Sequence, residues 1–497
     1  MRYTIGLDNG GTVIKAAIFN EMGEQIAVCN EKVPLLTPMP GFTERNLEAL
    51  WIANVTVIRK VIEKSRVEPS KIAALGISGH GKGLYLLDKE KKPLYNGIVS
   101  TDSRALSYEL EFMNNPTIKD KIRECNHQNI LACQPVCLLR WLKDRMPKVY
   151  QSIGTVLSVK DYIRYRLTGE IFAERTDISG SNLLNLTTGT YDRELLAMFG
   201  IEDIYDALPQ VKDSADNCGT ITKEVATLTG LSENTIVAGG MFDIDACALS
   251  LGIIDEEAVC VIAGTWSINE YISKTPTDEI AMNSYYCIPG YYLIEECSPT
   301  SAGNLDWILN QFFAKEIELT GGLNGEFYDW LNTTVGLVKI EENEIVFLPF
   351  LFGSNESAGM KAALLNLSAS STKGEIAEAI YEGVIFSHKT HIEKLKKAKK
   401  DLTCIRLAGG VTKSDIWCRM FADILNVDVY TVSDCETGCF GASIAAGIAV
   451  GLFEDYQEAV KKAVSFDKIY KPNPKNVEVF TKKYMCYKKI VENLKNI

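Results

Sequence analysis

The N-terminal segment, residues 1–17, constrains the fold most, because it predicts a strand, an acidic glycine turn and a second strand with no helix between them. The turn is Asp8-Asn9-Gly10-Gly11-Thr12. Glycines let backbone N–H groups approach phosphate oxygens closely, Asp8 can hold Mg²⁺ through water, and Thr12 adds a hydroxyl donor. A Walker loop would instead contain Gly-Lys-Ser/Thr and begin a helix. Taken alone, the pattern leaves an ordinary acidic hairpin as the alternative.

A similar turn, Gly264-Thr265-Trp266-Ser267, follows the apolar run 258–263, about half a chain downstream. By itself this second turn is compatible with a plain hairpin. Together the two turns predict an old duplication, with one phosphate turn at the head of each half. We expect them to hold the phosphates of a nucleotide from the two sides of a cleft.

Strand-like and helical patterns alternate along the 497 residues, which indicates an α/β architecture. The length favours two large domains, and we place the junction between residues 248 and 249, within a stretch uncertain by several residues. The predicted elements include helices at 47–64 and 158–169 and strands at 72–78 and 235–240. The stretch 373–399 predicts a long helix with a charged, solvated outer face.

Composition excludes several classes of protein. A net charge of −12 argues against a nucleic-acid partner. The fourteen cysteines show no metal-binding spacing, and we expect reduced, mostly buried thiols and a cytoplasmic location. The sequence predicts no signal peptide and no membrane span; its longest uncharged run, 437–453, is shorter than the ~20 apolar residues that a span needs and predicts a tightly packed helix.

The candidate general base is Asp243, which follows a predicted strand and a glycine turn. Its carboxylate would accept the proton of an attacking sugar hydroxyl during in-line transfer of a γ-phosphoryl group. Asp245 lies two residues further on, and the spacing alone does not choose between the two. Either aspartate could instead cap the helix that follows.

Two further turns offer groups for a sugar. Asp102 and Arg104 follow an apolar strand and supply the donors and acceptors that sugar hydroxyls need. The loop 78–83 contains His80 and Lys82, and the Lys82 ammonium suits a carbonyl, carboxylate or phosphate oxygen. Exposed, solvated turns would look similar in both cases.

Glycine turns near the C-terminus offer a nucleotide site. Gly409 and Gly410 follow a predicted strand, and Ser414 begins the next helix, either as a ligand or only as its N-cap. The segment 436–442 repeats this pattern. We expect the two segments to form an adenine and ribose pocket together.

At these residues the chain resembles the FGGY carbohydrate kinases, which have the two-domain actin/hexokinase/Hsp70-like (ribonuclease H-like) fold with a central cleft. The resemblance implies ATP and Mg²⁺ as cofactors, with Asp8 at the metal. It implies nucleotide contacts from both phosphate turns and from the Gly409-Gly410 loop, and sugar contacts from Asp102 and Arg104. The nucleotide-binding residues so expected are Gly10, Gly11, Thr12, Lys15, Gly264, Thr265, Asn304, Gly409, Gly410 and Ser414, and those expected at the sugar are His80, Lys82, Asp102, Arg104 and Asp243.

The family usually places about twenty-two positions between its catalytic aspartate and the threonine of the second turn, which favours Asp243 over Asp245. Runs 76–83, 298–307 and 347–351 are similar to L-xylulose (3-keto-L-gulonate) kinases, and run 242–246 resembles erythritol kinases. D-xylulose kinases carry histidine at the position of Lys82, and the family usually has lysine at that of Leu138, so D-xylulose is the less favoured substrate. A polyol remains an alternative, as do a non-catalytic sugar-binding protein and an actin-like filament protein. A homodimer is compatible with the family.

Overall fold

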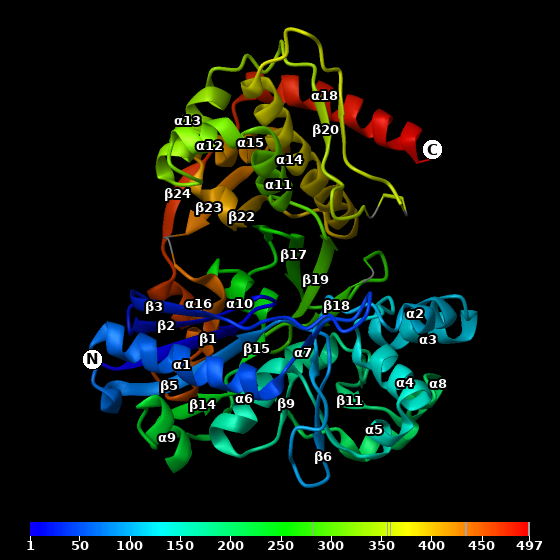
Figure 1. The fold of residues 1–497 in the computed structure, drawn as a ribbon, viewed down its shortest axis with the longest axis vertical. Coiled ribbons are helices and arrows are strands. Elements are labelled where there is room, and N and C mark those ends of the chain that lie inside the picture. Colours follow the sequence, from blue (N-terminus) through cyan, green and yellow to red (C-terminus); the bar gives the residue numbers. More distant parts are fainter. Residues whose placement is uncertain (281, 355, 358, 433–434, 496–497) are drawn as a thin grey trace. The chain divides into compact units, whose positions relative to one another are not determined.

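The computed structural model describes all residues except 281, 355, 358, 433–434 and 496–497 (Figure 1). The chain forms two compact units. The first contains Met1–Ile254, Ile272–Ile294 and Asp434–Ser465, and the second contains Asp255–Tyr271, Glu295–Ser433 and Phe466–Ile497. These units differ from a division at residue 248, because two later segments pack with the N-terminal residues rather than with their neighbours in the sequence.

The first unit is built on a sheet in which β13, β14, β5, β1, β2 and β3 lie in that order. Strands β1 (Tyr3–Asn9) and β5 (Ile72–Gly79) are parallel, and β2 (Val13–Asn20) pairs antiparallel with β1, as predicted from the sequence. Asp8 of β1 lies opposite Ser78 of β5 and Lys15 of β2. Strand β15 (Met241–Phe242) pairs with Ser78 and Gly79 at the end of β5. This register brings the residue after β15, Asp243, to the edge of the sheet where β1 and β5 end.

Helices cover the two faces of this sheet. Ile5 and Leu7 alternate with Gly6 along β1 and share a buried core with Val57 of α1 (Leu47–Ser65). Helix α16 (Thr437–Ala449) contacts β1 and β5, and Figure 1 shows it beside the N-terminal strands. A Cβ atom on Gly6 would lie 1.7 Å from the Cys439 carbonyl oxygen, so only glycine allows so close an approach. The run 437–453, predicted to hold a packed helix, is therefore a helix that joins the first unit.

The remaining elements of the first unit surround this sheet and a second core of largely helical residues. Their bounds are β3 (Gln25–Lys32), β4 (Glu44–Arg45), β6 (Tyr85–Asp88), β7 (Gly97–Ile98), α2 (Leu106–Met113), α3 (Pro116–Asn126), α4 (Pro135–Arg145), α5 (Pro147–Gln151), β8 (Ile153–Leu157), α6 (Val159–Thr168), β9 (Ala173–Glu174), α7 (Arg175–Ser179), β10 (Leu184–Asn185), β11 (Thr190–Tyr191), α8 (Arg193–Met198), β12 (Val211–Lys212), β13 (Asn217–Thr220), α9 (Lys223–Thr229), β14 (Ile236–Ala238), α10 (Asp243–Ser250), β18 (Asn283–Tyr285) and α17 (Tyr456–Ala463).

The second unit repeats the strand pattern of the first. Strand β16 (Ala258–Ala263) is parallel to β22 (Cys404–Ala408), which is parallel to β23 (Asp428–Val432). Strands β17 (Ser267–Ser273) and β24 (Phe466–Tyr470) pair antiparallel on the two sides. In the first unit, β1, β5 and β14 are the parallel strands and β2 and β13 their antiparallel neighbours. The same order of pairings supports the duplication predicted from the two glycine turns.

Strand β19 (Tyr292–Ser298) lies next to β17 in this sheet. The other elements of the second unit are α11 (Gly303–Phe312), α12 (Ala314–Leu319), α13 (Gly325–Gly336), β20 (Val346–Leu348), β21 (Ala363–Leu365), α14 (Lys373–Ala398), α15 (Asp415–Leu425) and α18 (Pro474–Leu494).

Helix α14 corrects one expectation from the sequence. The prediction of a solvated surface helix is wrong, because sixteen of its twenty-six residues are buried. Two of its glutamates have internal partners: Asn343 donates to Glu378 at 2.6 Å, and Lys483 of α18 forms an ion pair with Glu382. These two charges, which contributed to the pattern that indicated exposure, are thus satisfied inside the unit.

Two findings concern the whole described chain. No helix among the described residues is both long and apolar enough to cross a bilayer. The fourteen cysteines are thiols that lie outside any disulfide, and Cys486 alone among them is exposed.

Candidate active site

The first phosphate turn lies between β1 and β2, and a buried arginine supports it. Arg45, which is fully buried, donates through Nη2 to the carbonyl oxygen of Gly10 at 3.1 Å and also to that of Gly11. Its Nε and Nη1 have no hydrogen-bond partner among the described residues. Thr12 is exposed. Arg45 therefore fixes the buried side of the turn, while the exposed Thr12 faces solvent.

Asp8 is a partly buried carboxylate at the end of β1. Ser78 Oγ donates to its Oδ1 at 3.2 Å, and a Cβ on Gly438 would lie 2.9 Å from its Oδ2. Burial raises the pKa of Asp8 to about 6, against the opposing effect of Lys15. A carboxylate that lacks full solvation gains from a bound cation, so its chemistry fits Mg²⁺.

The described residues contain no group of three or more His, Cys, Asp or Glu side chains placed to hold a metal ion. Mg²⁺ at phosphoryl-transfer sites is usually held by one or two carboxylates and the phosphates themselves, and keeps several waters. A single carboxylate at Asp8 fits that mode of binding.

Lys15 has a partner that the sequence did not indicate. Its Nζ lies 2.6 Å from Glu436 Oε2, just before α16. Burial lowers the pKa of Lys15, but the hydrogen bond and charge of Glu436 outweigh it and raise the pKa overall. The segment 436–442, expected at an adenine pocket, thus contacts Lys15 and Asp8 within the first unit.

The structure distinguishes Asp243 from Asp245. Asp245 is fully buried, and its Oδ1 accepts the backbone N–H of Cys287 at 2.9 Å. Asp243 is partly exposed at the first position of α10, directly after β15. Burial, then the charges of Asp8 and Asp177, raise its pKa well above the ordinary value, while Lys82 lowers it. Asp243 is therefore the aspartate placed among the other charged groups at the edge of the sheet.

Asp102 and Arg104 form a buried pair. Arg104 Nη2 donates to Asp102 Oδ2 and to Glu44 Oε1, both at 2.8 Å. The guanidinium carbon lies 4.1 Å from the ring centroid of Phe42 and 5.2 Å from that of Trp141. Arg104 Nη1 is buried and has no hydrogen-bond partner among the described residues. One donor of a rigidly held guanidinium thus remains for another molecule.

His80 and Lys82 occupy different depths of one loop. His80 is buried, with Nε2 3.0 Å from the hydroxyl of Tyr85, and burial lowers its pKa to about 3. Lys82 adopts φ +63°, and its Nζ lies 5.7 Å from the ring centroid of Phe242. The backbone N–H of Lys82 donates to Asp177 Oδ1 at 3.3 Å. His80 is thus a neutral residue that supports the loop, and the Lys82 ammonium is its charged group.

The second phosphate turn packs against the start of α11 in the second unit. Ser301 N–H donates to the carbonyl oxygen of Thr265 at 3.1 Å, and Gly303 N–H to that of Gly264 at 3.3 Å. Thr265 itself is exposed. Asn304 is fully buried and donates to the carbonyl oxygen of Ser301 at 2.8 Å, so it fixes the segment against which the turn packs.

A pocket of about 390 Å³ adjoins this turn within the second unit. Its floor includes Tyr381 and Trp417, whose rings stack with centroids 4.1 Å apart. The pocket is lined by Gly264, Thr265, Ala302, Gly303, Leu305, Asp306, Tyr328, Asn332, Tyr381, Gly410, Lys413, Ser414 and Trp417. A concave site with aromatic rings beside a phosphate turn is suited to a nucleoside.

Ser414 and Gly409 have local structural roles at this pocket. Ser414 Oγ accepts the backbone N–H of Trp417 at 3.2 Å as the N-cap of α15, and donates to Asn332 at 2.7 Å. Gly409 adopts φ +103°, and a Cβ there would lie 2.3 Å from the Ala263 carbonyl oxygen. Ser414 is therefore both a helix cap and a residue that lines the pocket.

Comparisons with known proteins identify the family. The N-terminal domain model of the FGGY family of carbohydrate kinases matches residues 3–250, and its C-terminal domain model matches residues 259–450. This chain belongs to the FGGY family of carbohydrate kinases. The predicted sugar kinase activity and the two-domain actin/hexokinase-like fold are thereby confirmed.

Individual FGGY kinases resemble the chain over nearly its full length. A probable L-xylulose kinase of Pasteurella multocida is 37% identical and covers 100% of this chain and 99% of its own. The L-xylulose/3-keto-L-gulonate kinase of Escherichia coli is 36% identical and covers 99% and 97%. The ligand-bound xylulose kinase structure of Lactobacillus acidophilus superposes with a TM-score of 0.89, is 25% identical and covers 99% and 98%.

The FGGY kinase also has polar residues at the site that sequence reasoning missed. Arg45 follows no motif, although its place two residues before the predicted helix 47–64 gave a weak signal. Lys160, Glu174 and Asp177 come from α6, β9 and α7 and form a buried ionic cluster beside Phe242. Such a cluster depends on the fold and leaves no fixed spacing in the sequence.

Proposed function

We propose that this FGGY kinase transfers the γ-phosphoryl group of ATP to a terminal hydroxyl of L-xylulose or of a related keto sugar acid such as 3-keto-L-gulonate. Support comes from the two relatives with those names, which match nearly the whole chain at 36–37% identity. The observation that carries the mechanism is the position of Asp243: partly exposed, with a raised pKa, and influenced by the charges of Asp8, Asp177 and Lys82.

Asp243 is the general base in this proposal. A carboxylate with a raised pKa accepts the proton of the sugar hydroxyl more readily than an ordinary aspartate. The hydroxyl oxygen forms a bond to the γ-phosphorus as the bond from that phosphorus to the bridging oxygen of ADP breaks. Lys82, which lowers the pKa of Asp243, balances part of the negative charge around it.

The other residues bind and orient the two substrates. Asp8 would hold Mg²⁺, which neutralises phosphate charge during the transfer. Gly10, Gly11, Thr12 and Lys15 take phosphate oxygens in the first unit, and Gly264 and Thr265 do so in the second. The pocket beside Gly410 and Ser414 takes the adenosine. Lys15 would exchange its bond to Glu436 for a phosphate.

Lys82 is the residue that bears most directly on the choice of sugar. Its ammonium suits the carboxylate of a keto sugar acid or the carbonyl of a ketose. Asp102 and Arg104 form one wall of the sugar site in this proposal, and Arg104 Nη1 is a buried donor without a partner among the described residues. D-xylulose is less favoured, because D-xylulose kinases have histidine at the position of Lys82 and the family usually has lysine at that of Leu138; a polyol kinase stays the alternative.

A non-catalytic sugar-binding protein is the alternative of another class. Loss of Asp8 or Asp243 would favour it, and both are present. We place the enzyme in the cytoplasm, where ATP is available and free thiols stay reduced. The net charge of −12 argues against a nucleic-acid partner, and a homodimer is compatible with the family; sedimentation equilibrium measures the mass of the assembly.

The test measures ADP release with Mg²⁺ and ATP against L-xylulose, D-xylulose, 3-keto-L-gulonate, L-ribulose, erythritol and glycerol. We expect L-xylulose or 3-keto-L-gulonate to give the highest kcat/KM, and Asp243→Asn to lower it by about 10²- to 10⁴-fold. Lys82→Met should weaken the binding of 3-keto-L-gulonate more than the binding of L-xylulose, if the Lys82 ammonium binds the carboxylate of the sugar acid. Equal activity of Asp243→Asn and the wild type would contradict the assigned base.

A further inference from the structure

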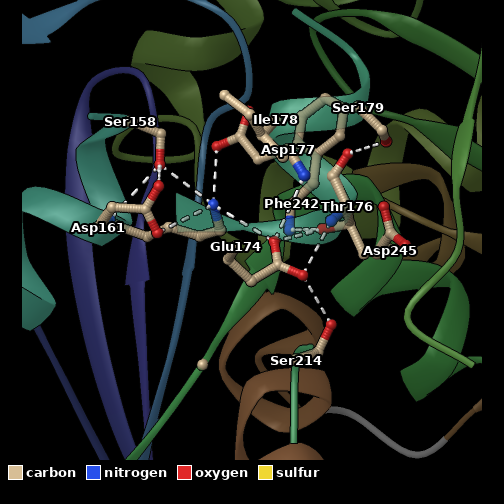
Figure 2. Close-up of polar contacts among 12 residues, drawn as sticks. Ser158, Asp161, Glu174, Thr176, Asp177, Ile178, Ser179, Ser214, Phe242 and Asp245 are labelled. Atoms are coloured by element: carbon tan, nitrogen blue, oxygen red, sulfur yellow. Dashed lines mark hydrogen bonds and ion pairs between the residues drawn. The ribbon is translucent and has the colours of Figure 1, made fainter. Parts of the chain in front are cut away.

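A buried ionic cluster lies behind the proposed base. We define the Lys160 cluster as Lys160, Asp161, Glu174 and Asp177. Lys160 Nζ lies 3.0 Å from Asp177 Oδ2, 3.4 Å from Glu174 Oε2 and 3.6 Å from Asp161 Oδ1. All four side chains are nearly or fully buried. Figure 2 shows the three acids turned toward one shared position, where dashed lines meet.

Burying so many charges rarely increases stability over an apolar core of the same shape, because their desolvation offsets their attraction. What such a network does supply is a fixed geometry, since each group must keep its partners. The backbone groups outside the Lys160 cluster that are hydrogen-bonded to it, directly or through Thr176, therefore indicate which part of the protein its fixed geometry positions.

One of those atoms is the backbone N–H directly before Asp243. Phe242 N–H donates to Thr176 Oγ at 2.9 Å, and Thr176 Oγ donates to Glu174 Oε2 at 2.7 Å. Thr176 N–H also donates to Glu174 Oε1 at 2.9 Å. The Thr176 hydroxyl thus links the Lys160 cluster to the peptide group that sets where Asp243 begins α10.

The second of these atoms is the backbone N–H of Lys82, the residue whose ammonium would bind the sugar. Asp177 Oδ2 binds Lys160, and its other oxygen, Oδ1, accepts the backbone N–H of Lys82 at 3.3 Å. Lys82 adopts φ +63°, a conformation that non-glycine residues adopt only when their surroundings hold it. Asp177 therefore fixes the Lys82 turn from the same cluster that fixes Phe242.

We infer that the Lys160 cluster positions two groups for phosphoryl transfer. Through Thr176 it places the base Asp243, and through Asp177 it places Lys82, so that the base and the Lys82 ammonium keep one relative geometry. Thr176 and Asp177 are positioning residues in this inference and touch neither substrate. The inference rests on the proposed role of Asp243. Small displacements of a base matter, because reacting atoms must be held within about 1 Å of the productive arrangement.

The decisive variants are Thr176→Val, which removes the hydroxyl at nearly constant volume, and Thr176→Ser, which keeps it. Ser214→Ala is the matched control, because Ser214 Oγ donates to the same Glu174 carboxylate at 2.8 Å but makes no bond to Phe242. We expect Thr176→Val to lower kcat by about 10- to 100-fold, with KM for sugar and for ATP changed by less than about threefold. Thr176→Ser should restore kcat to within about threefold of the wild type, and Ser214→Ala should leave it there.

The inference is overturned if Thr176→Val keeps the wild-type kcat, or if Ser214→Ala lowers kcat as much as Thr176→Val does. If Thr176→Val does not fold, as judged by circular dichroism, the Asp177 pair decides. Asp177→Ala should raise the KM for sugar by about tenfold, and Asp177→Asn, which keeps an acceptor for Lys82 N–H, should largely restore it. Equal KM values for both would refute the role of Asp177. Failure of the base assignment is seen separately, as an active Asp243→Asn.

Discussion

Replacing Asp8 by asparagine should inactivate the enzyme and stabilise it at the same time. Burial raises the pKa of Asp8 from 3.8 to about 6, so the folded protein binds a proton that the unfolded chain has already released between these values. Stability therefore falls as pH rises from about 4 to about 6, and the loss persists above that range. Two pKa units correspond to about 3 kcal/mol at pH 7 to 8. Asparagine is neutral at every pH, and its Oδ1 can keep the Ser78 hydrogen bond.

The assay is urea unfolding of the wild type and Asp8→Asn at pH 4 to 8, without Mg²⁺ or nucleotide. We expect no difference near pH 4 and an Asp8→Asn protein more stable by about 3 kcal/mol at pH 8, or by about 4 °C in thermal midpoint. The exposed Asp120, changed to asparagine, is the control. ADP release should be lost in Asp8→Asn. A stability difference that does not vary with pH, or a less stable variant at pH 8, would refute the argument.

Three further predictions concern other parts of the molecule. Gly410→Val adds a side chain where nothing lies within 4 Å of a Cβ, so KM for ATP should rise by about tenfold or more while the thermal midpoint changes little; an unchanged KM would place the adenosine elsewhere. Gly76→Ala should destabilise by about 1–3 kcal/mol or more, because its Cβ would lie 2.0 Å from the Ala442 carbonyl oxygen; wild-type stability in urea would contradict this packing. Burial lowers the pKa of His388 to about 3, so its neutral form stabilises the fold above pH 6.5, and that contribution is lost as pH falls toward 3, by about 1.4 kcal/mol per pH unit. His388→Gln should reduce the slope of the free energy of unfolding against pH by the equivalent of one proton in this range, and an unchanged slope would count against the argument.

The sequence predicted the parts of the site that depend on local pattern. The first seventeen residues predict a strand, an acidic glycine turn and a second strand without a helix, and β1 and β2 lie on the two sides of that turn. The strand at 72–78 was also predicted, but its parallel pairing with β1 is a finding of the structure. Spacing alone did not choose between Asp243 and Asp245. In the structure Asp245 is buried and accepts the backbone N–H of Cys287, whereas Asp243 is partly exposed.

The parts that pattern could not predict depend on contacts between distant residues. Arg45 supports the first turn from more than thirty positions away. Lys160 and Asp177 look like ordinary helix residues until the fold buries them together. The same limit explains α14, where Glu382 resembles a solvent-facing residue until Lys483, a hundred residues on, is seen to pair with it. Charge patterns indicate exposure only when no internal partner exists.

The packing of α16 has a consequence for how this protein is made. The N-terminal sheet meets the helix across Gly6 and Gly76, and that helix lies more than 350 residues later in the chain. A ribosome releases the two strands long before the helix that covers them, so one face of the nascent sheet stays open through most of translation. Because contacts so distant in sequence form slowly, the first unit is completed only after most of the second, residues 255–271 and 295–433, has been synthesised. The N-terminal half, expressed alone, lacks residues 272–294 and 434–465 of its unit and should therefore be captured by chaperones or aggregate, whereas adding both segments in trans should recover the fold.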